Sequence, residues 1–291
     1  MSFKTTLFMK LVRFGPFGAE KPGLLMEDGS IRDLSALYTD WSPAFFESGG
    51  LDGLRKLSVT EIASFPIVRN PVRLGSPFSR PRKMICVGLN YADHARESGM
   101  DAPGEPVLFM KGSNTVVGPD DEVMIPRNSV STDWEVELGV IICKTARYLS
   151  SEDDTPSHIA GYCISNDVSE RDFQLRRGGQ WVKGKSCDTF NPAGPWLVTS
   201  DAIDVSNLGM KLWVNGDLRQ SSTTAQMIFK VPFLIWYISQ FMTLEPGDFI
   251  TTGTPAGVGL GMKPPKYLSA GEVMELEIEG LGRQRQVCVN A

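Results

Sequence analysis

The stretch DWEVELGVII, residues 133–142, joins an acidic start to an unbroken apolar end. An apolar run of this kind is typical of a strand that is buried on both faces, so the sequence predicts a strand over 135–142. Side chains two positions apart on a strand share a face. Glu135 and Glu137 therefore point to the same side of the strand, and Asp133, two residues before Glu135, falls on that side as well. An E-x-E pair usually marks a solvated face, but like charges that enter a core repel each other and lose hydration unless a divalent cation binds them.

Strand patterns outnumber helix patterns on both sides of this stretch. The predicted strands cover 10–14, 22–26, 83–87, 159–166, 211–214 and 272–278, and the predicted helical segments cover 52–64, 93–99 and 232–242. Asp28-Gly29 and Asn215-Gly216 are hairpin-turn signals, and the prolines over 66–81 indicate a linker or an extended crossing. The sequence thus predicts an α+β fold in which β structure dominates. A small N-terminal α/β module over 1–75 precedes a larger domain over 82–291.

The composition is that of an ordinary globular protein, with 42% hydrophobic and 22% charged residues among 291. The net charge of -5 without a basic stripe argues against nucleic acid as a partner. No apolar stretch reaches membrane-spanning length and the start lacks a signal-peptide core, so we expect no membrane association. Five cysteines without a C-x-x-C pair indicate the reducing cytoplasm rather than a disulfide framework. With only two histidines, any metal site must rest mainly on carboxylates.

A third carboxylate, Asp167, closes the apolar run over 161–164. Aspartate at such a place often forms an Asx turn or a helix N-cap. Together with Glu135 and Glu137, however, it completes a set of oxygen ligands that suits Mg²⁺ or Mn²⁺ better than zinc. An octahedral ion with three protein ligands keeps positions open for the carboxylate and the keto oxygen of a 2-oxo acid.

His94 and Glu97 are three residues apart on the short helix predicted over 93–99, so their side chains face each other. A carboxylate that contacts an imidazole fixes its tautomer and raises its basicity, which makes a general base for water. An exposed pair of little consequence fits the spacing equally well. Gly88 and Gly99 flank the segment and would let it move as a lid.

Two glycine-rich loops carry further candidates. Lys185 is either an ordinary surface lysine or a cation that binds an anionic substrate and protonates the product enolate. In the loop over 251–259, the backbone amides and the hydroxyl of Thr254 could hold a carboxylate. This second loop is not a P-loop, because it lacks the GK[ST] ending.

These pieces, taken in order, resemble the fumarylacetoacetate hydrolase family over about 82–291. The matching motifs are Gly88 to His94, Pro106 to Lys111, Asp133 to Leu138, Asn166-Asp167 with Arg171, Asp172 and Gln174, then Lys185-Ser186, and Thr252 to Pro255. The resemblance implies a β-rich roll with a metal site at one end, usually in a homodimer. The pattern commonly has proline where Gly112 follows Lys111 in this chain.

The resemblance also implies a role for each candidate. Glu135, Glu137 and Asp167 would hold Mg²⁺ or a similar ion, and His94 with Glu97 would activate water on a lid. Lys185 matches the family's active-site lysine, and the positions expected to contact substrate are Lys111, Arg171, Gln174 and Thr254.

The predicted activity is hydrolysis of a C–C bond in an acylpyruvate-type 2,4-dioxo acid, which yields pyruvate and a second acid. The loops over 178–190 and 259–265 resemble the branch that hydrolyses 2,4-dioxo-3-deoxy sugar acids. Oxaloacetate decarboxylation and ureidoglycolate lyase activity are alternatives on the same metal site. A catalytically silent binding relative is a further alternative, although such a relative should have lost a ligand or the dyad.

Overall fold

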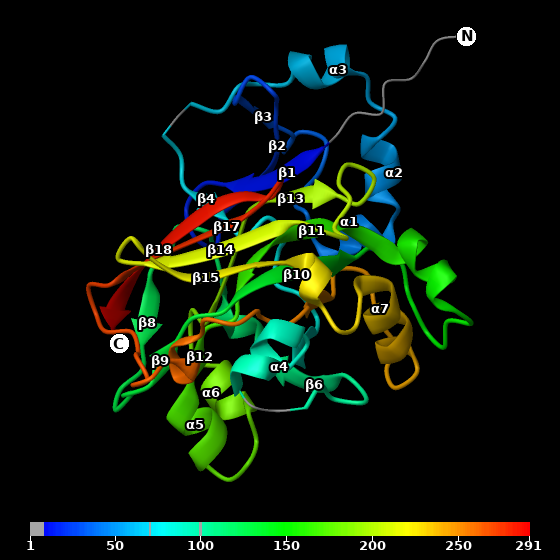
Figure 1. The fold of residues 1–291 in the computed structure, drawn as a ribbon. Helices are drawn as coiled ribbons and strands as arrows, with labels where there is room; N and C mark the ends of the chain where they lie inside the picture. Colours follow the sequence, from blue (N-terminus) through cyan, green and yellow to red (C-terminus); the bar gives the residue numbers. More distant parts are fainter. Residues whose placement is uncertain (1–8, 70, 99–100) are drawn as a thin grey trace.

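The computed structural model describes residues 9–69, 71–98 and 101–291 and contains three sheets. The largest, called here the main sheet, has eleven strands (Figure 1). Nine of them follow the order β3 (Ile31–Asp33), β2 (Lys21–Leu25), β1 (Lys10–Phe14), β13 (Asn191–Thr199), β11 (Ile159–Asn166), β10 (Val136–Ile142), β16 (Phe249–Thr251), β5 (Met84–Gly88) and β6 (Val107–Lys111). Two short strands, β4 (Leu74–Gly75) and β7 (Val116–Val117), pair with β1 and β13.

Strand β10 lies in the middle of the main sheet, and all seven of its residues are buried. It pairs antiparallel with β11 on one side and with β16 on the other. The apolar run of the sequence is therefore a two-sided buried strand, as predicted, although the strand begins at Val136. Asp133 belongs to the separate strand β9 (Thr132–Asp133), which pairs with β12 (Ser169–Glu170).

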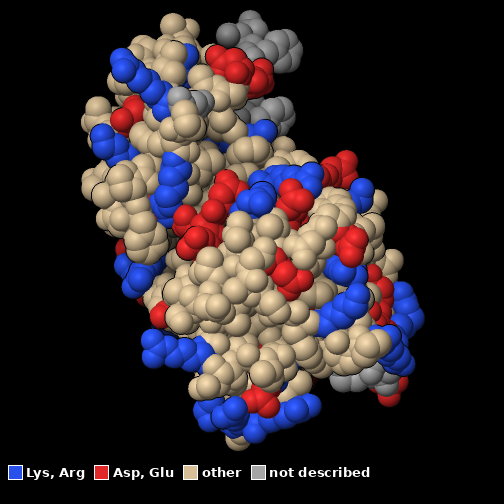
Figure 2. Space-filling model, turned by 90° about the vertical axis from the view of Figure 1, so that its left-hand side faces the viewer, with Lys and Arg blue, Asp and Glu red and all other residues tan. Residues whose placement is uncertain are grey.

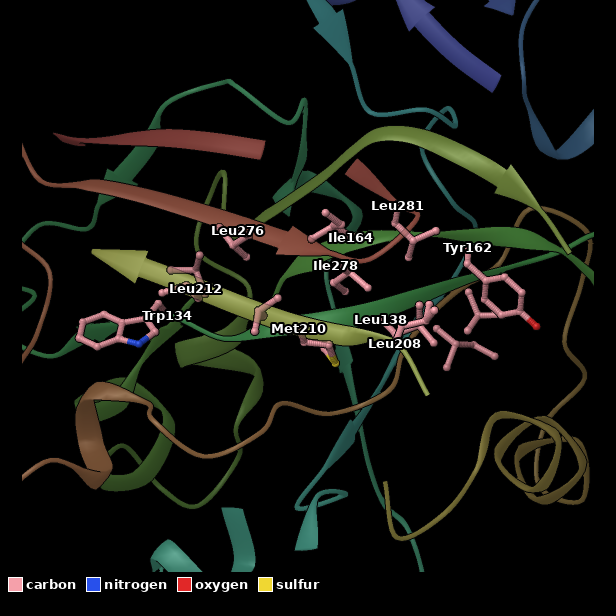
Figure 3. Packing of buried hydrophobic residues seen from close by; sticks show 14 of the residues in the cluster. Trp134, Leu138, Tyr162, Ile164, Leu208, Met210, Leu212, Leu276, Ile278 and Leu281 are labelled. Atoms are coloured by element: carbon pink, nitrogen blue, oxygen red, sulfur yellow. The ribbon is translucent and has the colours of Figure 1, made fainter. Parts of the chain in front are cut away.

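A second sheet packs beside the main sheet. Its order is β15 (Asp217–Thr223), β14 (Gly209–Val214), β17 (Val273–Ile278), β18 (Gly282–Asn290) and β8 (Val123–Ile125). Figure 3 shows the core between the sheets, where Leu138 and Ile164 of the main sheet lie near Met210, Leu212 and Leu276 of the second.

The two hairpins predicted from turn signals are present. Asn215 and Gly216 have φ values of 52° and 81° and connect β14 to β15. A two-residue turn of this type requires positive φ at both positions, which asparagine and glycine tolerate. Asp28-Gly29 likewise lies between β2 and β3.

The helices are short and lie outside the sheets. They are α1 (Pro43–Glu47), α2 (Gly50–Leu54), α3 (Val59–Ser64), α4 (Ala92–Ser98), α5 (Arg171–Arg176), α6 (Val182–Lys185) and α7 (Val231–Ser239), with 3₁₀ turns η1 (Ser113–Thr115), η2 (Glu152–His158), η3 (Thr224–Gln226) and η4 (Gly259–Gly261). The helical segment predicted over 52–64 is two helices, because Ser58 and Glu61 form a capping box that starts α3 anew. Gly99, the predicted lid hinge, lies outside the described residues. The strands outweigh the helices, and the fold is the predicted β-rich α+β type.

The N-terminal segment joins the main sheet instead of standing apart. β1 pairs antiparallel with β13, with Leu11 opposite Leu197. Trp41 and Phe45 pack in one cluster with Phe249 of the main sheet. The proline-rich stretch over 66–81 contains β4, which pairs with β1. The sheet and its core therefore cross the boundary predicted between 1–75 and 82–291, and that division stays a prediction.

Two further observations concern the surface and the cysteines. Basic and acidic side chains are interspersed over the face drawn in Figure 2. No helix within the described ranges combines the length and the apolar composition that a bilayer crossing requires. The five cysteines are all free thiols.

Candidate active site

Three carboxylates meet where β10 and β11 lie side by side. Val136 pairs with Asn166, so Glu135 and Asp167 occupy the two residues flanking this pair, and the amide of Asp167 donates to the carbonyl of Glu135 at 2.9 Å. Glu137 follows on β10. Each of the three offers a carboxylate oxygen within 4.8 Å of the others, and all three side chains are buried. The structure thus brings together the predicted metal ligands.

Two cations hold Glu135 from different sides. Nζ of Lys185 lies 2.7 Å from Oε2 of Glu135 and 2.9 Å from Oδ2 of Asp167, and Nη2 of Arg171 lies 2.7 Å from Oε1 of Glu135. Burial alone would raise the pKa of Glu135, but the charges of Lys185 and Arg171 lower it to about 2. Burial would lower the pKa of Lys185, and the charges of Asp167 and Glu135 raise it instead, so the ammonium stays charged.

Lys111 lies behind the cluster. Its Nζ donates to Oδ1 of Asp167 and to the carbonyls of Val168 and Phe190, at 3.1 and 2.7 Å for the carbonyls. These bonds use all three of its donors, and within the described chain Lys111 is not among the residues that line the cavity. The sequence predicted direct substrate contact, whereas the structure places this lysine as the buried counter-ion of Asp167.

Glu137 differs from the other two carboxylates in having no cationic partner among the described residues. Its Oε2 accepts a hydrogen bond of 2.7 Å from the backbone amide of Gly253. Burial raises the pKa of Glu137 well above its ordinary value, and the charges of Asp167 and Glu135 raise it further. Among the three carboxylates, Glu137 is therefore the one whose charged form is least compensated.

The charge balance and the donor set together fit a divalent cation. In the cluster and its ion pairs, the buried carboxylates are Asp133, Glu135, Glu137 and Asp167, and the buried cations that contact them are Lys111, Arg171 and Lys185. Two further buried carboxylates, Glu170 and Asp248, bind other partners, namely hydroxyl and amide groups and Lys83. Four negative charges against three positive ones leave one negative charge over. Carboxylate oxygens are the ligands that Mg²⁺ and Mn²⁺ prefer, and a divalent ion beside Glu137 would relieve the repulsion that raises its pKa.

Asp133 does not join the cluster that its parity with Glu135 suggested, because it belongs to β9 and the chain turns before β10. Its Oδ2 accepts from Nε of Arg171 at 2.8 Å, and its Oδ1 accepts from the amide of Gly259 at 2.7 Å. The amide of Leu260 also donates to it, at 3.0 Å. Asp133 thus ties Arg171 to the loop that contains η4, a role that the sequence pattern alone did not indicate.

The predicted dyad lies on α4. Nδ1 of His94 is 3.4 Å from Oε2 of Glu97, and it has no hydrogen-bond partner in the described part of the chain. The amide of Gly257 donates to the Glu97 carboxylate at 3.1 Å. A Cβ on Gly261 would come within 2.8 Å of Cδ of Glu97, so a larger residue at this position would displace the carboxylate. The loop over 257–261 therefore seats the carboxylate of the dyad.

The remaining predicted contacts, Gln174 and Thr254, face the cavity. Oε1 of Gln174 accepts from Nη1 of Arg171 at 3.1 Å. The hydroxyl of Thr254 donates to the carbonyl of Val136 at 3.0 Å and accepts from Nε2 of Gln220 at 2.8 Å. Gln220 lies 34 residues away from Thr254 in the sequence, and no local motif marked it.

The predicted residues, apart from Lys111, line a single cavity of about 730 Å³. Its polar part contains His94, Glu97, Glu135, Glu137, Asp167, Arg171, Gln174, Lys185 and Thr254. Its apolar part contains Val87, Leu89, Phe109, Leu175, Trp181, Val258, Leu260, Met262 and Pro265. A cavity of this size that combines an acidic cluster, a candidate base and an apolar wall can bind a small anionic substrate.

Comparisons with known proteins agree with this architecture. The family model described as fumarylacetoacetate (FAA) hydrolase C-terminal matches residues 83–289. A relative from Burkholderia multivorans, whose name gives it only the class of hydrolase, is 51% identical over 284 residues, which cover 96% of this chain and 98% of the relative.

Two solved structures share the fold over nearly the whole chain. Fumarylacetoacetate hydrolase from the psychrophilic Exiguobacterium antarcticum superimposes with a TM-score of 0.86 at 38% identity, covering 97% of this chain and 100% of that one. Maleylpyruvate hydrolase from Sphingobium sp. SYK-6, solved in complex with manganese(II) and pyruvate, gives a TM-score of 0.79 at 30% identity, covering 97% and 100%. The chain therefore belongs to the fumarylacetoacetate hydrolase family.

Proposed function

We propose that the protein is a metal-dependent hydrolase that cleaves a C–C bond in an acylpyruvate-type 2,4-dioxo acid and releases pyruvate and a second carboxylic acid. The observation that carries the proposal is that His94 and Glu97 line the same cavity as Glu135, Glu137 and Asp167. A reaction that needed only a metal and an enolate, such as decarboxylation, would leave a water-activating dyad at this place without a task.

The charge balance supports an anionic substrate of the 2-oxo acid class. A divalent ion added to the cluster turns the local excess from one negative to one positive charge, which matches a monoanionic pyruvoyl group. The maleylpyruvate hydrolase with the same fold was solved with manganese(II) and pyruvate. By analogy, Glu135, Glu137 and Asp167 would hold Mg²⁺ or Mn²⁺ in this chain. When bound, such an ion polarises a carbonyl oxygen and offsets the negative charge that develops on it.

Side chains around the cluster would orient the substrate. Arg171 is held by Asp133, Glu135 and Gln174, so its position is fixed before substrate arrives. The amide group of Gln174 faces the cavity and can donate to the substrate carboxylate. Thr254 also lines the cavity, but its hydroxyl proton is donated to the Val136 carbonyl, so this residue would contact the substrate without donating to its carboxylate. Lys185, kept charged by its two carboxylate neighbours, maintains the positions of Glu135 and Asp167 and adds a cation near the pyruvoyl end.

His94 would act as the general base. A carboxylate at Nδ1 favours the tautomer with its proton on that nitrogen, which leaves Nε2 free to accept a proton from water. The water oxygen then adds to the carbonyl carbon at C4, and the C3–C4 bond breaks with its electron pair moving toward the C2 carbonyl. Proton return to C3 gives pyruvate, while C4 leaves as the carboxyl carbon of the second acid. The 3.4 Å separation in the dyad is of the loose kind common before substrate binds.

The test is a substrate panel with three metal conditions. The protein is assayed with acetylpyruvate, a longer acylpyruvate and oxaloacetate, each with chelator, with Mg²⁺ and with Mn²⁺. We expect acylpyruvate cleavage that disappears in chelator and returns with either ion. Cleavage that persists unchanged in chelator would remove the metal from the mechanism. Turnover of oxaloacetate without turnover of any acylpyruvate would replace hydrolysis by decarboxylation.

A further inference from the structure

We infer that the acyl half of the substrate is a flat apolar group, such as an aryl ring, and that Trp181 is the residue that selects it. The inference rests on the proposed function and specifies the part of the substrate that the acidic cluster does not hold. Trp181 is partly exposed and lines the cavity together with Phe109.

An aromatic wall begins directly beside the cluster. Nζ of Lys185, which contacts Glu135 and Asp167, lies 5.1 Å from the ring centroid of Phe109. The Phe109 centroid in turn lies 5.3 Å from that of Trp181, in an edge-on arrangement. A substrate whose pyruvoyl end is held at the cluster would therefore extend its acyl end along these two rings.

The local backbone fixes the indole at this distance from the cluster. Trp181 immediately precedes α6, and the amide of Lys185 donates to the Trp181 carbonyl at 3.1 Å. The two side chains are thus one helical turn apart and project on the same side. Lys185 and Trp181 are therefore coupled in position, one serving the charged end of the cavity and the other its apolar end.

Gly88 makes room for the indole. A Cβ at this position would come within 2.8 Å of Cζ3 of Trp181, closer than real contacts allow. Gly88 lies at the end of β5, which pairs with β6 and its Phe109. The lack of a side chain at residue 88 lets the indole lie close against the sheet.

Apart from the polar residues already described, the side chains that line the cavity offer almost no hydrogen bonds. They include Val87, Leu89, Leu175, Val258, Leu260, Met262 and Pro265, with the exposed Lys263 as a further polar residue. A hydroxylated acyl chain would lose hydration here without gaining partners, whereas an aryl ring gains area and favourable ring contacts. This argues against the hydroxylated substrates that the loop resemblance over 178–190 and 259–265 predicts.

The test compares Trp181→Ala with Trp181→Phe and with Trp213→Ala as a matched control. Trp213 is a half-buried indole under Arg283 on the second sheet, away from the cavity. The substrates are acetylpyruvate, benzoylpyruvate and a polyhydroxylated 2,4-dioxo acid. In the wild type we expect kcat/KM to be highest for benzoylpyruvate. Trp181→Ala should lower that value about tenfold or more and change the value for acetylpyruvate by less than about threefold, while Trp181→Phe retains most activity and Trp213→Ala retains all of it.

Each outcome bears on a different statement. Equal losses on acetylpyruvate and benzoylpyruvate in Trp181→Ala, or a wild-type preference for the hydroxylated acid, would overturn the assignment of Trp181 and leave the proposed hydrolase intact. If the wild type cleaves none of the three acids with Mg²⁺ or Mn²⁺, the proposed function is rejected and the inference falls with it.

Discussion

The carboxylate of Glu137 lies 2.7 Å from the backbone amide of Gly253 and depends on that neutral donor, while its two neighbours in the cluster are held by lysine and arginine. A buried carboxylate without a cation destabilises the fold whenever it is charged. This arrangement would link the stability of the protein to the proposed divalent ion, and it leads to opposite expectations for Glu137→Gln and Lys185→Met.

Glu137→Gln should stabilise the metal-free protein at pH 7. The pKa of Glu137 is raised in the folded state, so the folded protein keeps a proton that the unfolded chain releases above about pH 4.5. The free energy of unfolding therefore falls as the pH rises from about 4.5 toward the pKa of the folded state. A rise of one in the folded-state pKa corresponds to about 1.4 kcal/mol of stability. Each kcal/mol changes Tm by roughly 2–4 °C. Thermal melts in chelator should show the gain at pH 7 and a smaller gain at pH 5.

The control for this substitution is Glu275→Gln, which removes a partly exposed glutamate paired with Arg283 on the second sheet and should change little. With Mn²⁺ added, the wild type should gain stability and Glu137→Gln should gain less. A Glu137→Gln protein that melts below the wild type in chelator at pH 7 would contradict the charge assignment.

Lys185→Met should have the opposite effect on the metal-free protein. It removes the ammonium between Glu135 and Asp167, and breaking a buried pair costs about 3–5 kcal/mol. A divalent cation would offset part of the added negative charge, so the rise in Tm on adding Mn²⁺ should exceed that of the wild type. Lys183→Met, at an exposed lysine two residues earlier that donates to the Arg177 carbonyl, is the matched control. An unchanged rise in Tm would mean that Lys185 does not share its carboxylates with the metal.

His94→Ala and Glu97→Gln should separate chemistry from metal binding. Removal of the general base should lower kcat on the order of 10²-fold or more, and loss of the orienting carboxylate should lower it by less. Neither residue is one of the proposed metal ligands, so both variants should keep the wild-type rise in Tm with Mn²⁺. An unimpaired His94→Ala enzyme would exclude this mechanism.

Asp133→Asn should loosen the loop that seats Glu97. The carboxylate of Asp133 accepts from Arg171 and from two amides of η4, and asparagine supplies only one acceptor oxygen in the same space. We expect lower thermal stability, faster amide exchange over 257–263 and a reduced kcat on the preferred acid. Wild-type exchange in that loop would show that Asp133 does not position it.

The parts of the fold that depend on local patterns could be predicted from the sequence. The buried strand β10 follows from its unbroken apolar run, and the β14–β15 hairpin follows from Asn215-Gly216, whose backbone conformation few other residue pairs adopt. Helices α5 and α6 could not be predicted, because six and four residues are too few for a helical periodicity to appear.

The candidate site also has a part that could be predicted from the sequence and a part that could not. Glu135, Glu137 and Asp167 stand at the ends of predictable strands, so their meeting follows once the two strands pair. The positions of Lys111 and Asp133 depend on which side of the cluster each chain segment passes, and this is decided by tertiary packing. Nothing in the residues around Lys111 distinguishes a lysine that faces the cavity from one that supports Asp167 from behind.

The pairing of β1 with β13 has a consequence for the solubility of shortened forms. Without residues 9–75, the backbone around Leu197 and Val198 would lose its partner β1 and become an edge of the sheet. Side chains that share a cluster with Trp41, such as Phe249, would be exposed to water. Unpaired strand edges next to apolar surface recruit other chains. By covering this edge of the sheet, the N-terminal segment protects the protein from aggregation. A fragment limited to residues 83–289, the region that the family model matches, should accumulate as insoluble protein.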